Sequence, residues 1–407
     1  MGTNHNRGIT PRLEPLYAHV VGWGMAVPEK VLTNDDLAAI VETSDEWIRK
    51  MTGIRERRIA GEMDTTATLG FKAAQRALEV ADVLPTEIDL IIVATSTPEH
   101  IFPSSASLIQ SWLGATKAGA FDLSAACSGF VYGMDMAAQA IRSGSIQTAV
   151  VIGSETMSRV MDWQDRATCI LFGDGAGAVV LTASPVEGGV LSTVLRSDGS
   201  GGDLLGIPTV GSIDIGDIPV LVNGYKPGKM HMNGSEVFKF ATRVIGESIT
   251  QALDIAGLTI KDLKLIVPHQ ANTRILQAAA RALKVDESFF VSNIDRYGNT
   301  SSASIPIALC DALAQGRIKQ NDYIALVGFG GGLTWASMVI QWGTPPPEDR
   351  SVISFNKQRR QVSYRLAWWR ARMSRLTHQF NSVINRIRPQ QGRIERLRRR
   401  MEQNDFR

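Results

Sequence analysis

The chain has 407 residues, of which 44% are hydrophobic, enough to bury one large core or two of medium size. No apolar run reaches the roughly 18 residues that a membrane-spanning helix needs, and the three cysteines are too far apart for a disulfide framework or a Cys-x-x-Cys zinc motif. The net charge of +3 conceals an asymmetry, because residues 346–407 carry 16 Lys and Arg against 5 Asp and Glu, whereas residues 1–345 carry 27 against 35. An acidic body with a basic tail indicates two parts with different partners.

The start of the chain is polar and has no hydrophobic signal core, so we predict a flexible leader over residues 1–16 of a cytoplasmic protein. Beyond it, short β-rich runs alternate with longer helical patterns, which favours an α/β fold. The predicted strands are Asp89–Ala94, Thr148–Ile152, Ala178–Leu181, Lys264–Val267 and Tyr323–Val327, and the clearest helices are Leu69–Ala81 and Phe130–Ile141.

One unit of this pattern occurs twice. A strand, a turn leading into a helix, and a second strand recur about 175 residues apart, in the regions 89–153 and 264–328. The repeat predicts two pseudo-symmetric halves, residues 17–188 and 189–345. It also places Cys127 and Asn299 in equivalent turns at helix starts, which would bring them to one shared site.

Cys127 precedes Ser128, Gly129 and an apolar helix. The positive end of a helix macrodipole and free backbone N–H groups favour a thiolate, so we expect a lowered pKa and a nucleophilic sulfur. The alternative is a buried structural cysteine. Cys169 and Cys310 lie inside apolar runs and are interpreted as core residues.

Three further features have both a functional and a structural interpretation. His269 ends a predicted strand, where α/β sheets build their sites, but such a histidine is more often structural. Asn299 either acts in a site or caps the next helix. The glycines in Phe329–Trp335 either expose N–H groups to an oxyanion or form a tight turn. Gly173–Ala178 looks like a dinucleotide-binding loop but runs into a strand instead of a helix.

Together, these segments resemble the β-ketoacyl-[acyl-carrier-protein] synthase III family over almost all of residues 18–343. The resemblance implies a thiolase-like α/β fold with two pseudo-symmetric halves in a layered α-β-α-β-α arrangement, followed here by a helical C-terminal extension. The strings that carry it, in the order that the family shows, are Thr43–Ile48, Met51–Ile59, Ala125–Phe130, Phe172–Gly177, Val267–Asn272, Tyr297–Ser301 and Gly328–Trp335.

The resemblance also implies an activity: decarboxylative condensation of an acyl-CoA starter with malonyl-acyl carrier protein by a homodimer, without a metal or resident cofactor. Cys127 would accept the acyl group, while His269 and Asn299 would promote decarboxylation. The implied secondary roles are an oxyanion hole made by the N–H groups of Cys127 and Gly331, coenzyme A contacts from Trp47, Arg166, Asn272 and Arg274, and contact of Phe102 with the acyl pocket of the partner subunit.

The sequence departs from the family pattern in three places. Met51 stands where the family often has an arginine that meets the nucleotide, residues 201–229 are about ten longer than usual, and the family normally ends near Trp342. A biosynthetic thiolase is disfavoured, because the glycine turn holds no second cysteine. Two alternatives stay open: a relative that acts on other acyl-CoAs in specialised metabolism, and a scaffold or membrane-recruitment protein that acts through its tail.

The tail, residues 346–407, follows a linker at Pro345–Pro347. Its apolar residues are spaced 4, 3, 4, 3, 4, 3 and 4 apart, which predicts one long helix with a heptad seam and, after Pro389 and Gly392, a short second helix. The seam comprises Val362, Leu366, Trp369, Met373, Leu376, Phe380, Val383 and Ile387. This tail either packs on the body or across a dimer, lies on an anionic membrane, or docks acidic carrier protein or nucleic acid.

Overall fold

The computed structural model describes residues 15–208, 226–343 and 356–367, together with residues 369, 370, 373 and 377. The predicted leader therefore lies almost entirely outside the described residues. Most of the lengthened segment 201–229 and the predicted second helix of the tail also lie outside the described residues.

The first sheet has five strands in the order β1-β7-β6-β4-β5. β4 is parallel to β5 and β6, and β7 is antiparallel to β1 and β6. Every residue of β6 is buried, which explains its uninterrupted apolar run. The strands are β1 (Tyr17–Ala26), β4 (Leu90–Ala94), β5 (Gly119–Leu123), β6 (Thr148–Thr156) and β7 (Asp174–Ser184).

The second sheet repeats the first without an equivalent of β5. Its order is β11-β12-β13-β8, with β11 parallel to β12 and the other pairs antiparallel. The predicted boundary between residues 188 and 189 lies in the connection from β7 to β8. The strands are β8 (Gly189–Ser197), β11 (Leu263–Pro268), β12 (Tyr323–Gly330) and β13 (Thr334–Gln341).

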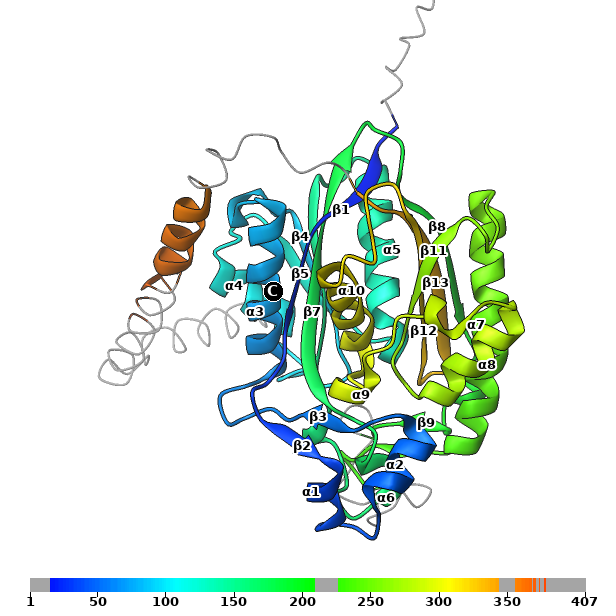
Figure 1. The fold of residues 1–407 in the computed structure, drawn as a ribbon. Coiled ribbons are helices and arrows are strands. Elements are labelled where there is room, and N and C mark those ends of the chain that lie inside the picture. The colour runs from blue at the N-terminus through cyan, green and yellow to red at the C-terminus, as the bar shows by residue number, and fades with distance from the viewer. Residues whose placement is uncertain are drawn as a thin grey trace, which may run out of the picture.

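Helices form three layers around the two sheets (Figure 1). Two cover the outer face of the first sheet, two lie between the sheets, and two cover the outer face of the second. The predicted layered α-β-α-β-α arrangement is therefore confirmed. In that order the helices are α3 (Thr66–Ala81) and α4 (Ser105–Leu113), α5 (Gly129–Arg142) and α10 (Ser304–Ala314), and α7 (Gly234–Ala256) and α8 (Thr273–Leu283).

Short elements gather at one end of the layers (Figure 1). α2 illustrates why they form: the Ser44 side chain accepts a hydrogen bond from the Trp47 N–H at its start, and Gly53 ends it with a φ of 84°. These elements are β2 (Val31–Thr33), α1 (Asn34–Ala38), α2 (Asp45–Thr52), β3 (Glu56–Arg58), α6 (Arg166–Cys169), β9 (Leu205–Gly206), β10 (His231–Met232) and α9 (Ile294–Tyr297). Among the helices that the structure describes, none is long and apolar enough to span a bilayer.

Candidate active site

Two equivalent turns meet at the centre of the molecule. A 3-10 turn, η2 (Ala126–Ser128), precedes α5, and another, η6 (Ser301–Ala303), precedes α10. Both turns contain a non-glycine residue with left-handed backbone, Ala126 at a φ of 45° and Ser301 at 49°. Such backbone is strained for a residue with a side chain, and it is concentrated at functional sites. The turns are in contact: Cys127 Sγ lies 3.5 Å from Ser301 Oγ.

The end of β12 passes directly against the cysteine turn. A Cβ atom on Gly330 would lie 2.7 Å from the Cys127 nitrogen and 3.1 Å from its sulfur, and one on Gly328 would lie 2.8 Å from the Ser128 Cα. Only glycine allows such an approach of two backbones. The glycine run therefore does more than form a turn, because it brings β12 beside the sulfur.

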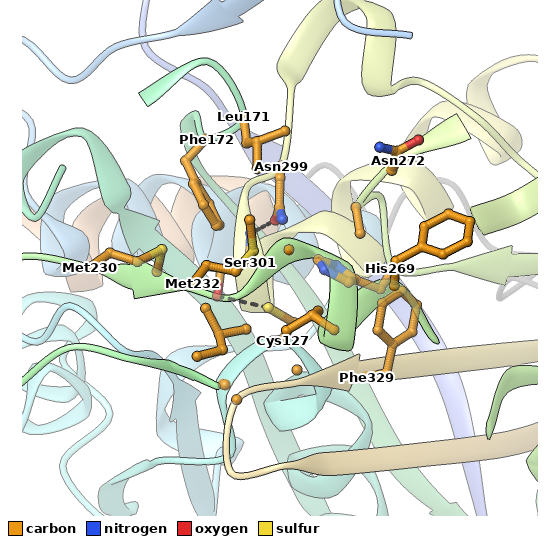
Figure 2. Close-up of a pocket in the computed structure, with 18 of the residues that line it drawn as sticks. Cys127, Leu171, Phe172, Met230, Met232, His269, Asn272, Asn299, Ser301 and Phe329 are labelled. Atoms are coloured by element: carbon orange, nitrogen blue, oxygen red, sulfur yellow. Dashed lines mark hydrogen bonds between the residues drawn. The ribbon is translucent and has the colours of Figure 1, made fainter. Parts of the chain in front are cut away.

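A cavity of about 960 Å³ opens over these turns. Cys127, His269 and Asn299, from three distant stretches of the chain, all line it, and Figure 2 shows their side chains around one space. All three are buried. Gly331 lines the same cavity, as do Trp47, Asn272 and Arg274.

His269 follows the end of β11 and is held on two sides. Its Nδ1 lies 2.6 Å from Ser304 Oγ, and its ring meets Phe329 edge-on at 5.1 Å between centroids. The Gln270 N–H donates to the same Ser304 oxygen, at 3.4 Å, which leaves the hydroxyl hydrogen for Nδ1. This arrangement favours the tautomer with hydrogen on Nε2. Burial lowers the pKa of His269 to about 3, so the ring is neutral and Nε2 is a donor.

This burial predicts how stability depends on pH. The unfolded chain takes up a proton at His269 near its ordinary pKa of 6.5, whereas the folded chain does so only at about 3. The stability contribution of neutral His269 is thus complete above pH 6.5 and is lost as the pH falls towards 3. Between these two pH values, we expect His269→Gln to reduce the slope of the unfolding free energy against pH by up to about 1.4 kcal/mol per pH unit. Urea unfolding at several pH values measures this slope for wild type and for His269→Gln. Equal slopes for the two proteins would contradict the prediction.

Asn299 has its amide oriented by the neighbouring turn. Its Oδ1 accepts a hydrogen bond of 2.8 Å from the Ser301 N–H, and its own backbone N–H donates to the Leu171 carbonyl at 2.8 Å. With the oxygen engaged, the amide nitrogen remains as the donor at the cavity. Cys127 therefore shares its cavity with two neutral hydrogen-bond donors.

The electrostatics of Cys127 differ from the expectation drawn from the sequence. Burial raises the pKa of the Cys127 thiol to about 12, and the carboxylate of Glu155 adds to the rise, whereas the Ser301 hydrogen bond opposes it. The prediction of a lowered pKa is therefore wrong for the resting chain. The physical reason is that loss of water around the sulfur outweighs the favourable end of α5.

No motif in the sequence pointed to Glu155, which is fully buried next to this turn. Ser301 Oγ, the contact of the thiol, donates to Glu155 Oε1 at 3.0 Å, and Thr97 Oγ1 donates to Oε2 at 2.6 Å. The Ser96 N–H donates to the same carboxyl at 3.0 Å. Burial raises the pKa of Glu155, and these bonds oppose the rise. The carboxyl thus fixes Ser301 and, through it, the sulfur. The one indication of this role in the sequence is that the glutamate stands in an apolar strand, where an acidic residue is unusual.

Three of the four residues predicted to meet coenzyme A, Trp47, Asn272 and Arg274, line the cavity. The Arg166 guanidinium lies over the Trp47 ring at 5.1 Å and donates to the Glu42 carbonyl at 2.8 Å, although Arg166 itself is not among the lining residues. The Asn272 amide donates to the Met51 carbonyl at 2.9 Å. Met51 lines the cavity as well.

Phe102, which was predicted to reach the acyl pocket of a partner subunit, lies outside the cavity. Its side chain is 86% exposed and does not line the cavity of this single chain. Its predicted contact with a partner subunit therefore stays a prediction. Within the described ranges, no group of three or more His, Cys, Asp or Glu residues is arranged to hold a metal ion.

Comparison with known proteins decides the family. Two family profiles match, 3-oxoacyl-[acyl-carrier-protein] synthase III over residues 121–199 and its C-terminal domain over residues 253–342. A β-ketoacyl-[acyl-carrier-protein] synthase III of Roseiflexus sp. is 50% identical over 328 residues, which are 80% of this chain and 98% of the relative. The chain belongs to the β-ketoacyl-[acyl-carrier-protein] synthase III family.

Solved structures of 3-oxoacyl-[acyl-carrier-protein] synthases III are similar to the fold of this chain. The 3-oxoacyl-[acyl-carrier-protein] synthase III of Aquifex aeolicus is 44% identical, with a TM-score of 0.74, and the enzyme of Thermus thermophilus is 43% identical, with a TM-score of 0.75. Each match covers 80% of this chain and 100% of the other. The thiolase-like fold and the class of condensing acyltransferase implied by the motifs are thereby confirmed. The basic tail lies beyond residue 342, where the C-terminal profile ends.

Proposed function

We propose that this protein condenses an acyl-CoA starter with malonyl-acyl carrier protein, releasing carbon dioxide and coenzyme A. The observation that carries the proposal is the convergence of Cys127, His269 and Asn299 on one cavity. The names of the relatives, which are β-ketoacyl-[acyl-carrier-protein] synthases III, support the carrier protein as the second substrate.

In the first half-reaction, Cys127 Sγ attacks the carbonyl carbon of the acyl-CoA thioester. The new sulfur–carbon bond replaces the bond to coenzyme A, which leaves as its thiol with the proton that Cys127 loses. Because the resting thiol is protonated, we expect attack and proton loss to be coupled. The backbone N–H groups of Cys127 and Gly331 would stabilise the oxyanion.

In the second half-reaction, malonyl-acyl carrier protein loses carbon dioxide, and the electron pair of the broken bond forms a thioester enolate. His269 Nε2–H and the Asn299 amide would donate hydrogen bonds to the enolate oxygen. Both groups are neutral and rigidly held, so they need no reorganisation as charge develops. The enolate carbon then attacks the acyl group on Cys127, and the cysteine sulfur leaves as a thiolate, which takes up a proton from water to restore the resting thiol.

We assign the contacts to coenzyme A and to a partner subunit from the same family resemblance. Trp47, Arg166, Asn272 and Arg274 would hold coenzyme A at the entrance, with Met51 in place of a basic group. A homodimer is expected because β5 is at the edge of its sheet and because Ile101 and Phe102, in the connection from β4 to α4, are exposed.

A two-step labelling experiment tests this function. Incubation with radiolabelled acetyl-CoA should label the protein, and malonyl-acyl carrier protein should then move the label into β-ketoacyl-acyl carrier protein with release of carbon dioxide. A label that forms but moves only to a second acyl-CoA would favour the specialised relatives. Failure to label with any acyl-CoA would contradict the proposal.

A further inference from the structure

The start of the tail helix packs on the body through one of its faces. In helical residues 356–367, Asn356 and Arg360 both bind the carboxylate of Asp82, at 2.9 and 2.6 Å. The Tyr364 ring meets Phe71 of α3, and Ala367 packs near Gly114 at the end of α4. Both side chains of the Arg360–Asp82 pair are buried. This spacing of four, four and three residues defines the body-facing side of the helix.

The four seam residues that the structure describes lie on the other side of this helix. Val362, Leu366, Trp369 and Met373 are each at least 50% exposed. The successive spacings of four, three and four residues place them along one stripe, which we call the outer row. Packing on the body therefore accounts for the first face of the helix, whereas Val362, Leu366 and Met373 keep at least half of their surface exposed.

The charge around the outer row is of one sign. From residue 350 to residue 394 the sequence contains eleven Lys and Arg and no Asp or Glu. Arg365 and Arg370, which flank the outer row in sequence, are exposed. An apolar stripe with basic flanks and a tryptophan matches the requirements of a helix that lies in the surface of an anionic bilayer, with its apolar side among the acyl chains and its arginines at the headgroups.

We propose that the outer row binds the surface of anionic membranes, while the opposite face of the same helix holds it to the catalytic body. The enzyme would thereby be recruited to the bilayer without a spanning segment. This inference concerns where the enzyme works and does not depend on the reaction that its cavity performs.

Pairing of two tails through the same seam fits less well. In a two-stranded coiled coil, the positions beside the seam choose their partner by opposite charges. Here those positions include Arg365, Arg370 and Arg372 and offer no acid in return. Two copies would therefore bring like charges together.

Flotation of the full-length protein tests the proposal. We expect flotation with vesicles of phosphatidylcholine and phosphatidylglycerol, and much less with phosphatidylcholine alone. Leu366→Glu should reduce binding to the anionic vesicles by about tenfold or more, because burial of a leucine side chain is lost and an acid is placed in the bilayer. Gln361→Glu is the matched control, since it adds the same charge at an exposed position of the same helix outside the outer row.

A second variant separates membrane binding from contact with the body. Asp82→Asn removes the partner of Arg360 and leaves the outer row intact, so binding to the anionic vesicles should persist. Acylation by acyl-CoA should be unchanged in Leu366→Glu, which shows that the body is folded. The proposal is overturned if wild type binds neither vesicle, if Leu366→Glu and Gln361→Glu bind alike, or if Leu366→Glu instead halves the mass of the particle in sedimentation, which would assign the seam to a second copy.

Discussion

Replacing Cys127 by alanine is expected to abolish formation of the acyl-enzyme. The Cβ methyl group of alanine cannot form a thioester, and the serine beside it, Ser301, is bound to the Glu155 carboxyl instead of being directed at a substrate. The loss should be complete rather than graded, because Cys127 is the only one of the three cysteines that lines the cavity of the described chain. Mass spectrometry of the intact protein after incubation with acyl-CoA measures the adduct.

The two remaining cysteines provide matched controls. Cys169 and Cys310 are buried in apolar surroundings, and burial raises the pKa of Cys169 to about 11 and of Cys310 to about 12. Neither lines the cavity. Cys169→Ala and Cys310→Ala should therefore keep the full adduct. If the adduct persists in Cys127→Ala, or disappears in either control, the nucleophile has been misassigned.

The layered fold was predictable because its signals are local. Runs such as Thr148–Ile152 and Tyr323–Val327 are apolar on both sides of the strand, as buried parallel and mixed sheets require. The repeat of strand, turn and helix also anticipated that the turns before α5 and α10 meet, as the contact between η2 and η6 shows, although Asn299 precedes η6 by two residues and so is not at the position of Cys127.

The electrostatic details were not predictable, because they arise from residues distant in sequence. The lowered pKa expected for Cys127 considered only its own helix, whereas burial by β12 and the carboxyl of Glu155 determine the direction. Likewise, Ser304 determines the tautomer of His269 from 35 positions away. A sequence pattern identifies which groups can react, but the solvent around each group depends on the packed fold.

Replacing Asn299 by aspartate is expected to stop condensation while acylation of Cys127 continues. The substitution keeps the shape of the side chain and one oxygen to accept the Ser301 N–H, so the turn should remain in place. It exchanges the amide donor for an acceptor, and a charged one when ionised, beside the developing enolate. Loss of one such donor costs about 10²–10³ in rate, and the charge should add to that loss.

The two half-reactions distinguish this effect from general damage. Rapid-quench labelling with acyl-CoA should give the wild-type adduct in Asn299→Asp, whereas transfer to malonyl-acyl carrier protein should fall by at least the factor expected for a lost donor. Asn321→Asp is the matched control: it makes the same chemical change at an exposed position outside the cavity, and both steps should stay at wild-type rates. Equal losses in both half-reactions of Asn299→Asp would show that Asn299 supports the turn of Ser301 and Cys127, because a donor to the enolate acts only after the acyl group is in place.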